Sequence, residues 1–147
     1  MDEFQPGLSD EEQIALSIRG KEINYKFQLL DINNIKFYRK NPRIATILAE
    51  QSIGINDNVI DGVLWDRNET HKLYRTIERD GGLIHPIVVY KNEVLEGNTR
   101  LCCYRHLYNT TKNDKWRFIK AHVIMDELSQ DEIYRFMAIK ACSKGTT

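Results

Sequence analysis

The sequence lacks an excess of charge of either sign, and it also lacks a long apolar run. Lysine plus arginine and aspartate plus glutamate each number 21 in the 147 residues, so no net positive field draws the whole chain to nucleic acid. No apolar stretch approaches the ~20 residues that span a bilayer, and the acidic first residues are unlike a signal peptide. We therefore expect a cytoplasmic protein without a membrane partner, and a dedicated DNA-coating protein is disfavoured.

Cysteine is scarce as well. The chain has three, of which Cys102 and Cys103 are adjacent and Cys142 lies far along the sequence. An odd number that includes an adjacent pair builds neither a disulfide framework nor a Cys-x-x-Cys metal site. We expect reduced thiols that behave as small buried hydrophobic residues.

Histidine offers no metal-binding pattern either. Three histidines without a common spacing are expected to be structural or solvated: His71, His106 and His122. The sequence therefore predicts no protein-built metal site.

Hydrophobic periodicity and helix-end signals predict a mixed α+β domain on a small sheet. Strands are expected over 23–29, 86–90, 93–96 and 118–125. Helices are expected over 10–19, 42–51, 68–80, 99–108 and 130–139. Within 23–29 apolar and polar residues alternate, which is typical of a half-buried strand. The weakly patterned segment 52–66 is expected to be a loop or insertion.

The stretch EGNTR, which begins at Glu96, lies where an expected strand gives way to an expected helix. A helix N-terminus attracts anions through its unsatisfied N–H groups and its dipole, and Gly97 would let a ligand approach the backbone. Arg100 adds a planar fork suited to phosphate oxygens. Glu96 could hold Mg²⁺, accept a ribose hydroxyl or act as a base. In the alternative, Asn98 or Thr99 only caps the helix and Arg100 pairs with a surface carboxylate.

Two elements around this stretch resemble the N-terminal domain of the ParB family, within the ParB/sulfiredoxin fold. The first is GLIHPIVV, which begins at Gly82, and the second is the Gly-x-x-Arg of residues 97–100. Upstream, LLDINNIKFYRKNPR is similar to the family's opening strand and its Asn-Pro…Arg segment. The resemblance covers roughly 27–140. It implies an N-terminal helix and strand extension over 1–26, followed by a ParB/sulfiredoxin-like domain over 27–147 with an insertion near 48–66.

In ParB proteins these elements form a nucleotide pocket. The phosphate-binding residues that the resemblance implies are Gly97, Asn98, Thr99, Arg100 and Arg43. The nucleoside-binding residues that it implies are Gly82, Ile84 and His85. The implied ligand is CTP or ATP with Mg²⁺, the implied activity includes NTP hydrolysis, and the implied setting is a DNA-linked role of a plasmid, phage or bacterial chromosome. DNA and a second copy of the chain are then partners to test.

The sequence departs from the ParB pattern in two places that bear on function. Where the family has a metal-linked Glu-Asn-x-x-Arg motif, this chain has Ile139 and Lys140, so binding of Mg²⁺-triphosphate in the ParB manner is in doubt. The sequence ends where the family's helix-turn-helix DNA-binding domain begins, so we expect either a protein without that domain or a fragment.

Other functions of the fold remain as alternatives. Sulfiredoxin chemistry is excluded because its loop uses a cysteine nucleophile where this chain has Asn98, and an amide cannot attack a phosphorylated sulfinate. The run from Glu96 to Arg100 is similar to the acid-Gly-x-Thr-Arg loop of free-serine kinases, which keeps open a phosphotransferase or nuclease with Glu96 as catalytic base. The non-enzymatic alternative is a protein-interaction module.

Overall fold

The computed structural model describes residues 24–38, 40, 56–82 and 85–145. The described residues fall into two compact units, those within 26–124 in one and those within 1–25 and 125–147 in the other. The helices expected over 10–19 and 42–51 lie outside the described residues, as do the candidate site residues Arg43 and Ile84.

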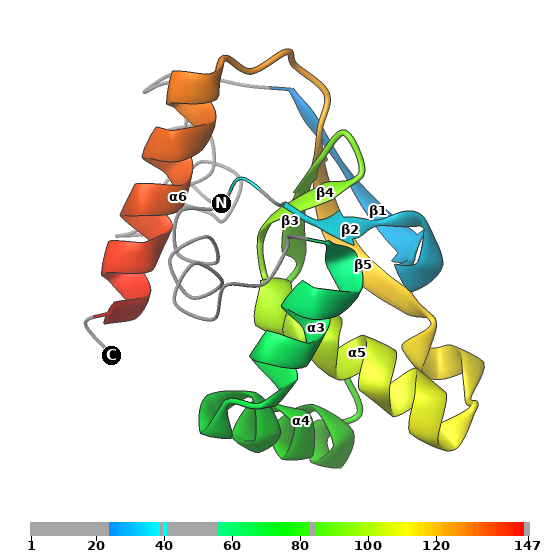
Figure 1. The fold of residues 1–147 in the computed structure, drawn as a ribbon. Helices are drawn as coiled ribbons and strands as arrows, with labels where there is room; N and C mark the ends of the chain where they lie inside the picture. The colour runs from blue at the N-terminus through cyan, green and yellow to red at the C-terminus, as the bar shows by residue number, and fades with distance from the viewer. Residues whose placement is uncertain (1–23, 39, 41–55, 83–84, 146–147) are drawn as a thin grey trace, which may run out of the picture. The chain divides into compact units, whose positions relative to one another are not determined.

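The larger unit is built on a five-stranded mixed sheet in the order β1-β5-β3-β4-β2 (Figure 1). Its strands are β1 (Tyr25–Asp31), β2 (Lys36–Phe37), β3 (Ile87–Tyr90), β4 (Glu93–Glu96) and β5 (Phe118–Ile124). The central strand β3 runs antiparallel to β4 and parallel to β5, while β2 runs parallel to β4. The predicted mixed α+β class is confirmed, and so are the four predicted strands.

The hairpin between β3 and β4 follows directly from local sequence. Lys91 and Asn92 adopt positive φ angles of 50° and 65°, the conformation that a two-residue hairpin turn requires. These two residues form the turn between β3 and β4. This turn places the end of β4, where the candidate site begins, next to the start of β3.

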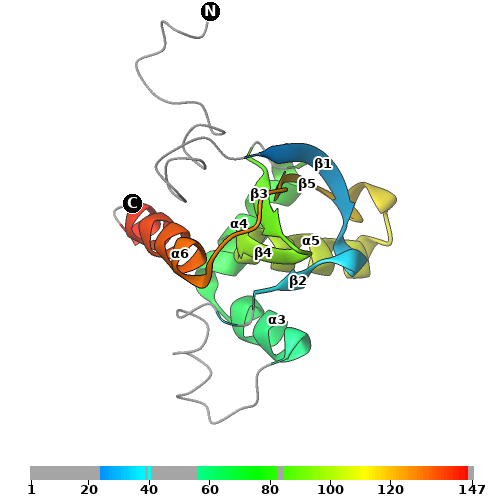
Figure 2. The same cartoon turned by 90° about the horizontal axis from the view of Figure 1, so that it is seen from above.

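The described residues of the larger unit form the α-helices α3 (Asp57–Trp65), α4 (Asn68–Asp80) and α5 (Asn98–Thr111). They also form two short 3₁₀ turns, Ile32–Asn34 and Asp114–Trp116. Helix α5 packs against both α4 and α3, as seen in Figures 1 and 2, and buried side chains of these helices and the sheet form one core. The helix predicted over 68–80 is confirmed, and Gly81 ends it in the left-handed conformation.

The prediction of a loop or insertion over 52–66 is wrong for the second half of this segment, which forms α3. Asn56 caps this helix by accepting a hydrogen bond from the Val59 N–H at 2.9 Å. Ile60 and Leu64, four residues apart, are buried in the core as one apolar face. These two side chains anchor α3 to the rest of the larger unit.

The strand predicted over 23–29 forms as β1, but its alternating apolar residues do not mark the face that is buried. Phe27 and Leu29 are 58% and 62% exposed, while Leu30 packs against the core. Because successive side chains of a strand point to opposite faces, Leu30 lies on the face opposite Phe27 and Leu29, and it is this face that packs on the core. The alternation identified the strand without identifying which face is buried.

The smaller unit contains α6 (Gln130–Gly145). A capping box precedes this helix: Ser129 Oγ accepts from the Glu132 N–H at 3.1 Å, and Glu132 Oε1 accepts from the Ser129 N–H at 2.9 Å. Asn24 is tied to Asp126 by two hydrogen bonds. Among the described residues, no helix combines the length and the apolarity that crossing a membrane requires.

Candidate functional site

The turn between β4 and α5 is made by Gly97, whose φ of 105° lies in the left-handed region. A Cβ at this position would lie 2.4 Å from the Ile87 side chain on β3. Glycine is therefore required here both by the backbone conformation and by close packing of the turn on the sheet. The sequence predicted a close approach at this glycine, and the group that approaches it in the structure is Ile87.

Helix α5 begins after Gly97, which is its N-cap residue, so the expected cap by Asn98 or Thr99 is wrong. Glycine has no side chain that could accept hydrogen bonds from the N–H groups of the first turn, which lie at the positive end of a 14-residue helix. Such an end favours an anionic partner.

Arg100 is held by three groups of the same region. Its Nη2 pairs with both carboxylate oxygens of Glu96, and its Nη1 donates to the carbonyl oxygens of His85 and Pro86 at 2.9 and 3.3 Å. The Arg100 and Glu96 side chains are only 14% and 11% exposed. Arg100 therefore ties the end of β4 and the start of α5 to the segment that leads into β3, and its charge is balanced by Glu96.

The structure brings together most of the candidate residues that it describes. Residues 96–100 form the turn, and the His85 backbone joins them through Arg100. The side-chain oxygen Oδ1 of Asn98 is buried and has no hydrogen-bond partner within the described residues. Gly82 lies beside α5, where a Cβ would be 3.7 Å from the Tyr104 hydroxyl.

Gly82 also lines an open hollow of about 580 Å³ on the larger unit. Its lining combines aromatic rings, ammonium groups and carboxylates, which come from Tyr104, Phe118, Lys115, Lys120, Asp80 and Asp114. The two carboxylates offset the charge of the two ammonium groups, so the hollow does not select an anion by its net charge. The hollow is a feature that the sequence pattern did not indicate apart from Gly82.

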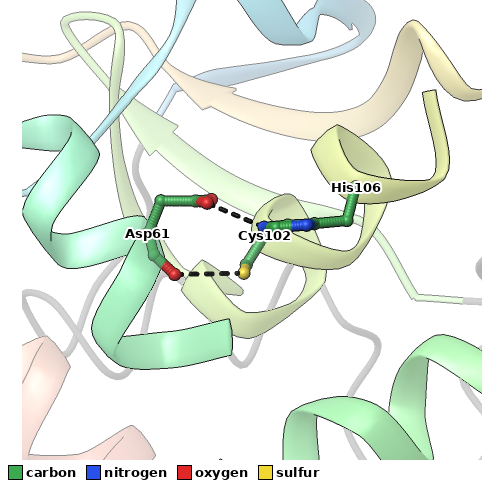
Figure 3. A group of neighbouring side chains, drawn as sticks. All are labelled: Asp61, Cys102 and His106. Atoms are coloured by element: carbon green, nitrogen blue, oxygen red, sulfur yellow. Dashed lines mark hydrogen bonds and ion pairs between the residues drawn. The ribbon is translucent and has the colours of Figure 1, made fainter. Parts of the chain in front are cut away.

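A second cluster joins α3 to α5, as Figure 3 shows. Asp61 comes from α3, and Cys102 and His106 lie four residues apart on α5. His106 Nε2 is 2.8 Å from Asp61 Oδ2, and the Cys102 thiol donates to the Asp61 backbone carbonyl at 3.6 Å. Sequence reasoning treated these residues separately. The one local signal was the Cys-x-x-x-His spacing, which puts both side chains on one face of a helix.

Both cysteines of α5 are free and buried, as expected for structural thiols. Burial, reinforced by the negative charge of Asp61, raises the pKa of Cys103 to about 12 and that of Cys102 still further. At neutral pH both are therefore thiols, which rules out a reactive thiolate in the protein as it stands.

Comparison with known proteins identified no related protein. No family model, curated protein or solved structure matches the chain. The class that the fold defines is an α+β domain with a five-stranded mixed sheet, and functional conclusions must come from the turn and the side-chain clusters themselves.

Proposed function

We propose that this chain is a ParB/sulfiredoxin-like domain that binds a nucleotide or another phosphorylated ligand at the N-terminus of α5. The observation that carries the proposal is that the N-cap residue of α5 is Gly97, which offers no side-chain acceptor to the first N–H groups of the helix. Phosphate oxygens can accept hydrogen bonds from these groups and are favoured by the helix dipole. The resemblance of residues 82–89 and 97–100 to the ParB pocket supports a nucleotide as the ligand.

Arg100 takes a different part in this proposal from the phosphate clamp that the sequence suggested. Its guanidinium is occupied by Glu96 and by two backbone carbonyls, so main-chain N–H groups make the phosphate contact and Arg100 holds them in place. The same pairing bears on the alternative enzyme, a phosphotransferase or nuclease with Glu96 as base. Both oxygens of Glu96 lie on Arg100, which favours a positioning role for this carboxylate.

Magnesium would enter this site with the ligand. Mg²⁺ is bound through carboxylate and phosphate oxygens and keeps several waters. The carboxylate of the turn is engaged by Arg100, so the residues of the turn do not form a magnesium site of their own. In the proposal a nucleotide's phosphates hold the ion, and hydrolysis of CTP or ATP remains a further prediction.

The experiment is calorimetric titration of CTP, ATP and ADP, with Mg²⁺ and with EDTA, into the wild type and two variants of Thr99. Thr99 is the second residue of α5, where an acidic side chain interacts favourably with the dipole. We expect Thr99→Glu to fold but to weaken nucleotide binding at least about tenfold by charge repulsion. Thr99→Gln, of similar size and no charge, should bind within about threefold of the wild type.

Two results would contradict the proposal. One is that no nucleotide binds the wild type at millimolar concentration. The other is equal binding by Thr99→Glu and Thr99→Gln, which would place the ligand elsewhere. A protein-interaction module without a ligand at the turn predicts the first of these results.

A further inference from the structure

The facing sides of α3 and α5 carry a second set of polar groups, apart from the 96–100 turn. Helix α3 contributes Asp61 and Trp65, and α5 contributes Cys102 and His106, each pair four residues apart. Figure 3 shows that the side chains of Asp61, Cys102 and His106 converge between the two helices. One oxygen, one sulfur and one nitrogen from these residues all lie within 4.8 Å of one another.

We propose that Asp61, Cys102 and His106 bind a thiophilic divalent cation, with Zn²⁺ as the best match. Sulfur and imidazole nitrogen are the ligands that zinc takes in proteins, and a carboxylate oxygen commonly joins them. The sulfur argues against Mg²⁺ and Ca²⁺, which take oxygen ligands. Three protein donors leave a fourth position of a tetrahedral ion for water or another ligand.

The spacing of the donor atoms suits a single ion. Zinc binds nitrogen and oxygen at ~2.1 Å and sulfur at ~2.3 Å, so donors at tetrahedral angles are roughly 3.3–3.7 Å apart. His106 Nε2 and Asp61 Oδ2 are 2.8 Å apart, and the Cys102 sulfur lies within 4.8 Å of one ring nitrogen of His106 and one carboxylate oxygen of Asp61. Small side-chain rotations therefore convert the Asp61–His106 hydrogen bond into two bonds to the ion.

Burial and charge give the site a second line of support. Asp61 Oδ1 is buried and has no hydrogen-bond partner within the described residues. A buried carboxylate oxygen without a partner is costly, and an ion or the water that it carries would satisfy it. Asp61 and His106 are 21% and 27% exposed, so an ion can reach the site from solvent, while Cys102 is fully buried at its inner side.

Neighbouring contacts hold the donors in place before any ion binds. Trp65 stacks on the imidazole of His106, with ring centroids 3.9 Å apart and planes 4° from parallel. Arg105 and Asp57 form an ion pair at 2.7 Å that also joins α5 to α3. Ordered support of this kind lowers the cost of assembling a metal site.

Binding would exchange one proton for the ion. Zinc binds cysteine sulfur as the thiolate, so the metal–sulfur bond forms as the thiol proton of Cys102 passes to the buffer. The resulting thiolate and the Asp61 carboxylate together balance the two positive charges. The ion would then clamp α3 to α5, the helix whose N-terminus forms the 96–100 turn.

The test is titration of the purified chain with Co²⁺, followed by displacement with Zn²⁺. Cobalt bound to a thiolate gives a sulfur-to-metal charge-transfer band in the near ultraviolet, which a site without sulfur does not give. The matched variants are Cys102→Ala and Cys103→Ala, because Cys103 is the adjacent buried cysteine and its thiol instead donates to the Thr70 carbonyl. Circular dichroism of each variant confirms that it folds.

We expect the band in the wild type and in Cys103→Ala, its loss in Cys102→Ala, and its removal by an equivalent of Zn²⁺. Asp61→Asn and His106→Gln, which keep the side-chain size, should each weaken Zn²⁺ binding at least about tenfold. The absence of a band in the wild type would overturn the proposal. So would a band retained in Cys102→Ala, or one lost equally in both cysteine variants.

Discussion

At the scale of single residues, the shape of the 96–100 turn depends on Gly97. Its left-handed φ and the closeness of Ile87 act together, because any Cβ would be strained and would also meet the β3 side chain at 2.4 Å. The glycine thus fixes how the first N–H groups of α5 are presented. This requirement is structural, and it holds whether or not a ligand binds.

We expect Gly97→Ala to lower the free energy of unfolding by about 2–4 kcal/mol, the sum of backbone strain and overpacking. The matched control is Gly62→Ala, since Gly62 is exposed within α3 and an added Cβ meets nothing within 4 Å. That change should stabilise the chain by about 0.5–1 kcal/mol through helix propensity. Urea unfolding measures both, and similar effects of the two substitutions would contradict the account of Gly97.

The carboxylate of Asp31, at the end of β1, makes the stability of the folded chain depend on pH in the acidic range. Its carboxylate accepts hydrogen bonds from the Asn33 backbone N–H at 2.9 Å and from Arg117 at 3.0 Å, and these contacts, the backbone bond first, lower its pKa below the ordinary value. Because the folded pKa is below that of the unfolded chain, the stabilisation is present above about pH 4 and is lost as pH falls through the folded value.

Asp31→Asn should therefore make the unfolding free energy less dependent on pH below about pH 4, where the wild type loses this contribution. Urea unfolding at a series of pH values measures the two slopes. Parallel slopes for the variant and the wild type would show that the Asp31 carboxylate does not contribute.

At the scale of secondary-structure elements, the Glu96–Arg100 pair joins β4, α5 and the segment before β3. The pair is mostly buried, so breaking it leaves a poorly solvated charge behind. We expect Glu96→Gln and Arg100→Ala each to destabilise the fold by about 2–3 kcal/mol. The double variant should cost less than the sum of the two, and the difference measures their coupling.

The same pair distinguishes a positioning carboxylate from a catalytic base. If Glu96 positions Arg100, Glu96→Gln and Arg100→Ala should weaken nucleotide binding by a similar factor. A base would instead show unchanged binding and lost turnover in Glu96→Gln, with binding lost only in Arg100→Ala. Calorimetry together with a phosphate-release assay separates these outcomes.

Local signals explain which elements the sequence predicts. The hairpin at Lys91 and Asn92, the end of α4 at Gly81 and the capping box at Ser129 all depend on residues a few positions apart. Helix α3 was missed because Gly62 and the polar residues before it weaken the apparent periodicity, although Ile60 and Leu64 form a buried face. The buried face of β1 depends on the core around it and has no local signature.

The two candidate sites differ in how far apart their residues lie in the sequence. The 96–100 turn is contiguous, so its composition alone indicates an anion-binding helix terminus. The composition of the turn does not predict that the Arg100 side chain pairs with Glu96. The cluster of Asp61, Cys102 and His106 joins residues about 40 positions apart, and it exists only because α3 packs against α5.

At the scale of the whole molecule, formal net charge is zero, so binding of a polyanion must come from local groups. The positive end of α5 is such a group for a phosphate, and its effect falls off within one turn of the helix. A DNA partner and a homodimer remain predictions that rest on the resemblance to ParB. Neither is required for a nucleotide to bind at the turn.

The central claim is that a phosphate-bearing ligand meets the first N–H groups of α5, and amide NMR tests it most directly. In ¹H–¹⁵N spectra of the chain titrated with CTP and then with ATP, the account predicts that the largest shifts fall on the amides of Asn98, Thr99 and Arg100. At the same nucleotide concentration, Thr99→Glu should make these shifts smaller, because it weakens binding. Shifts that centre on other residues, or spectra that do not change at millimolar nucleotide, would contradict it.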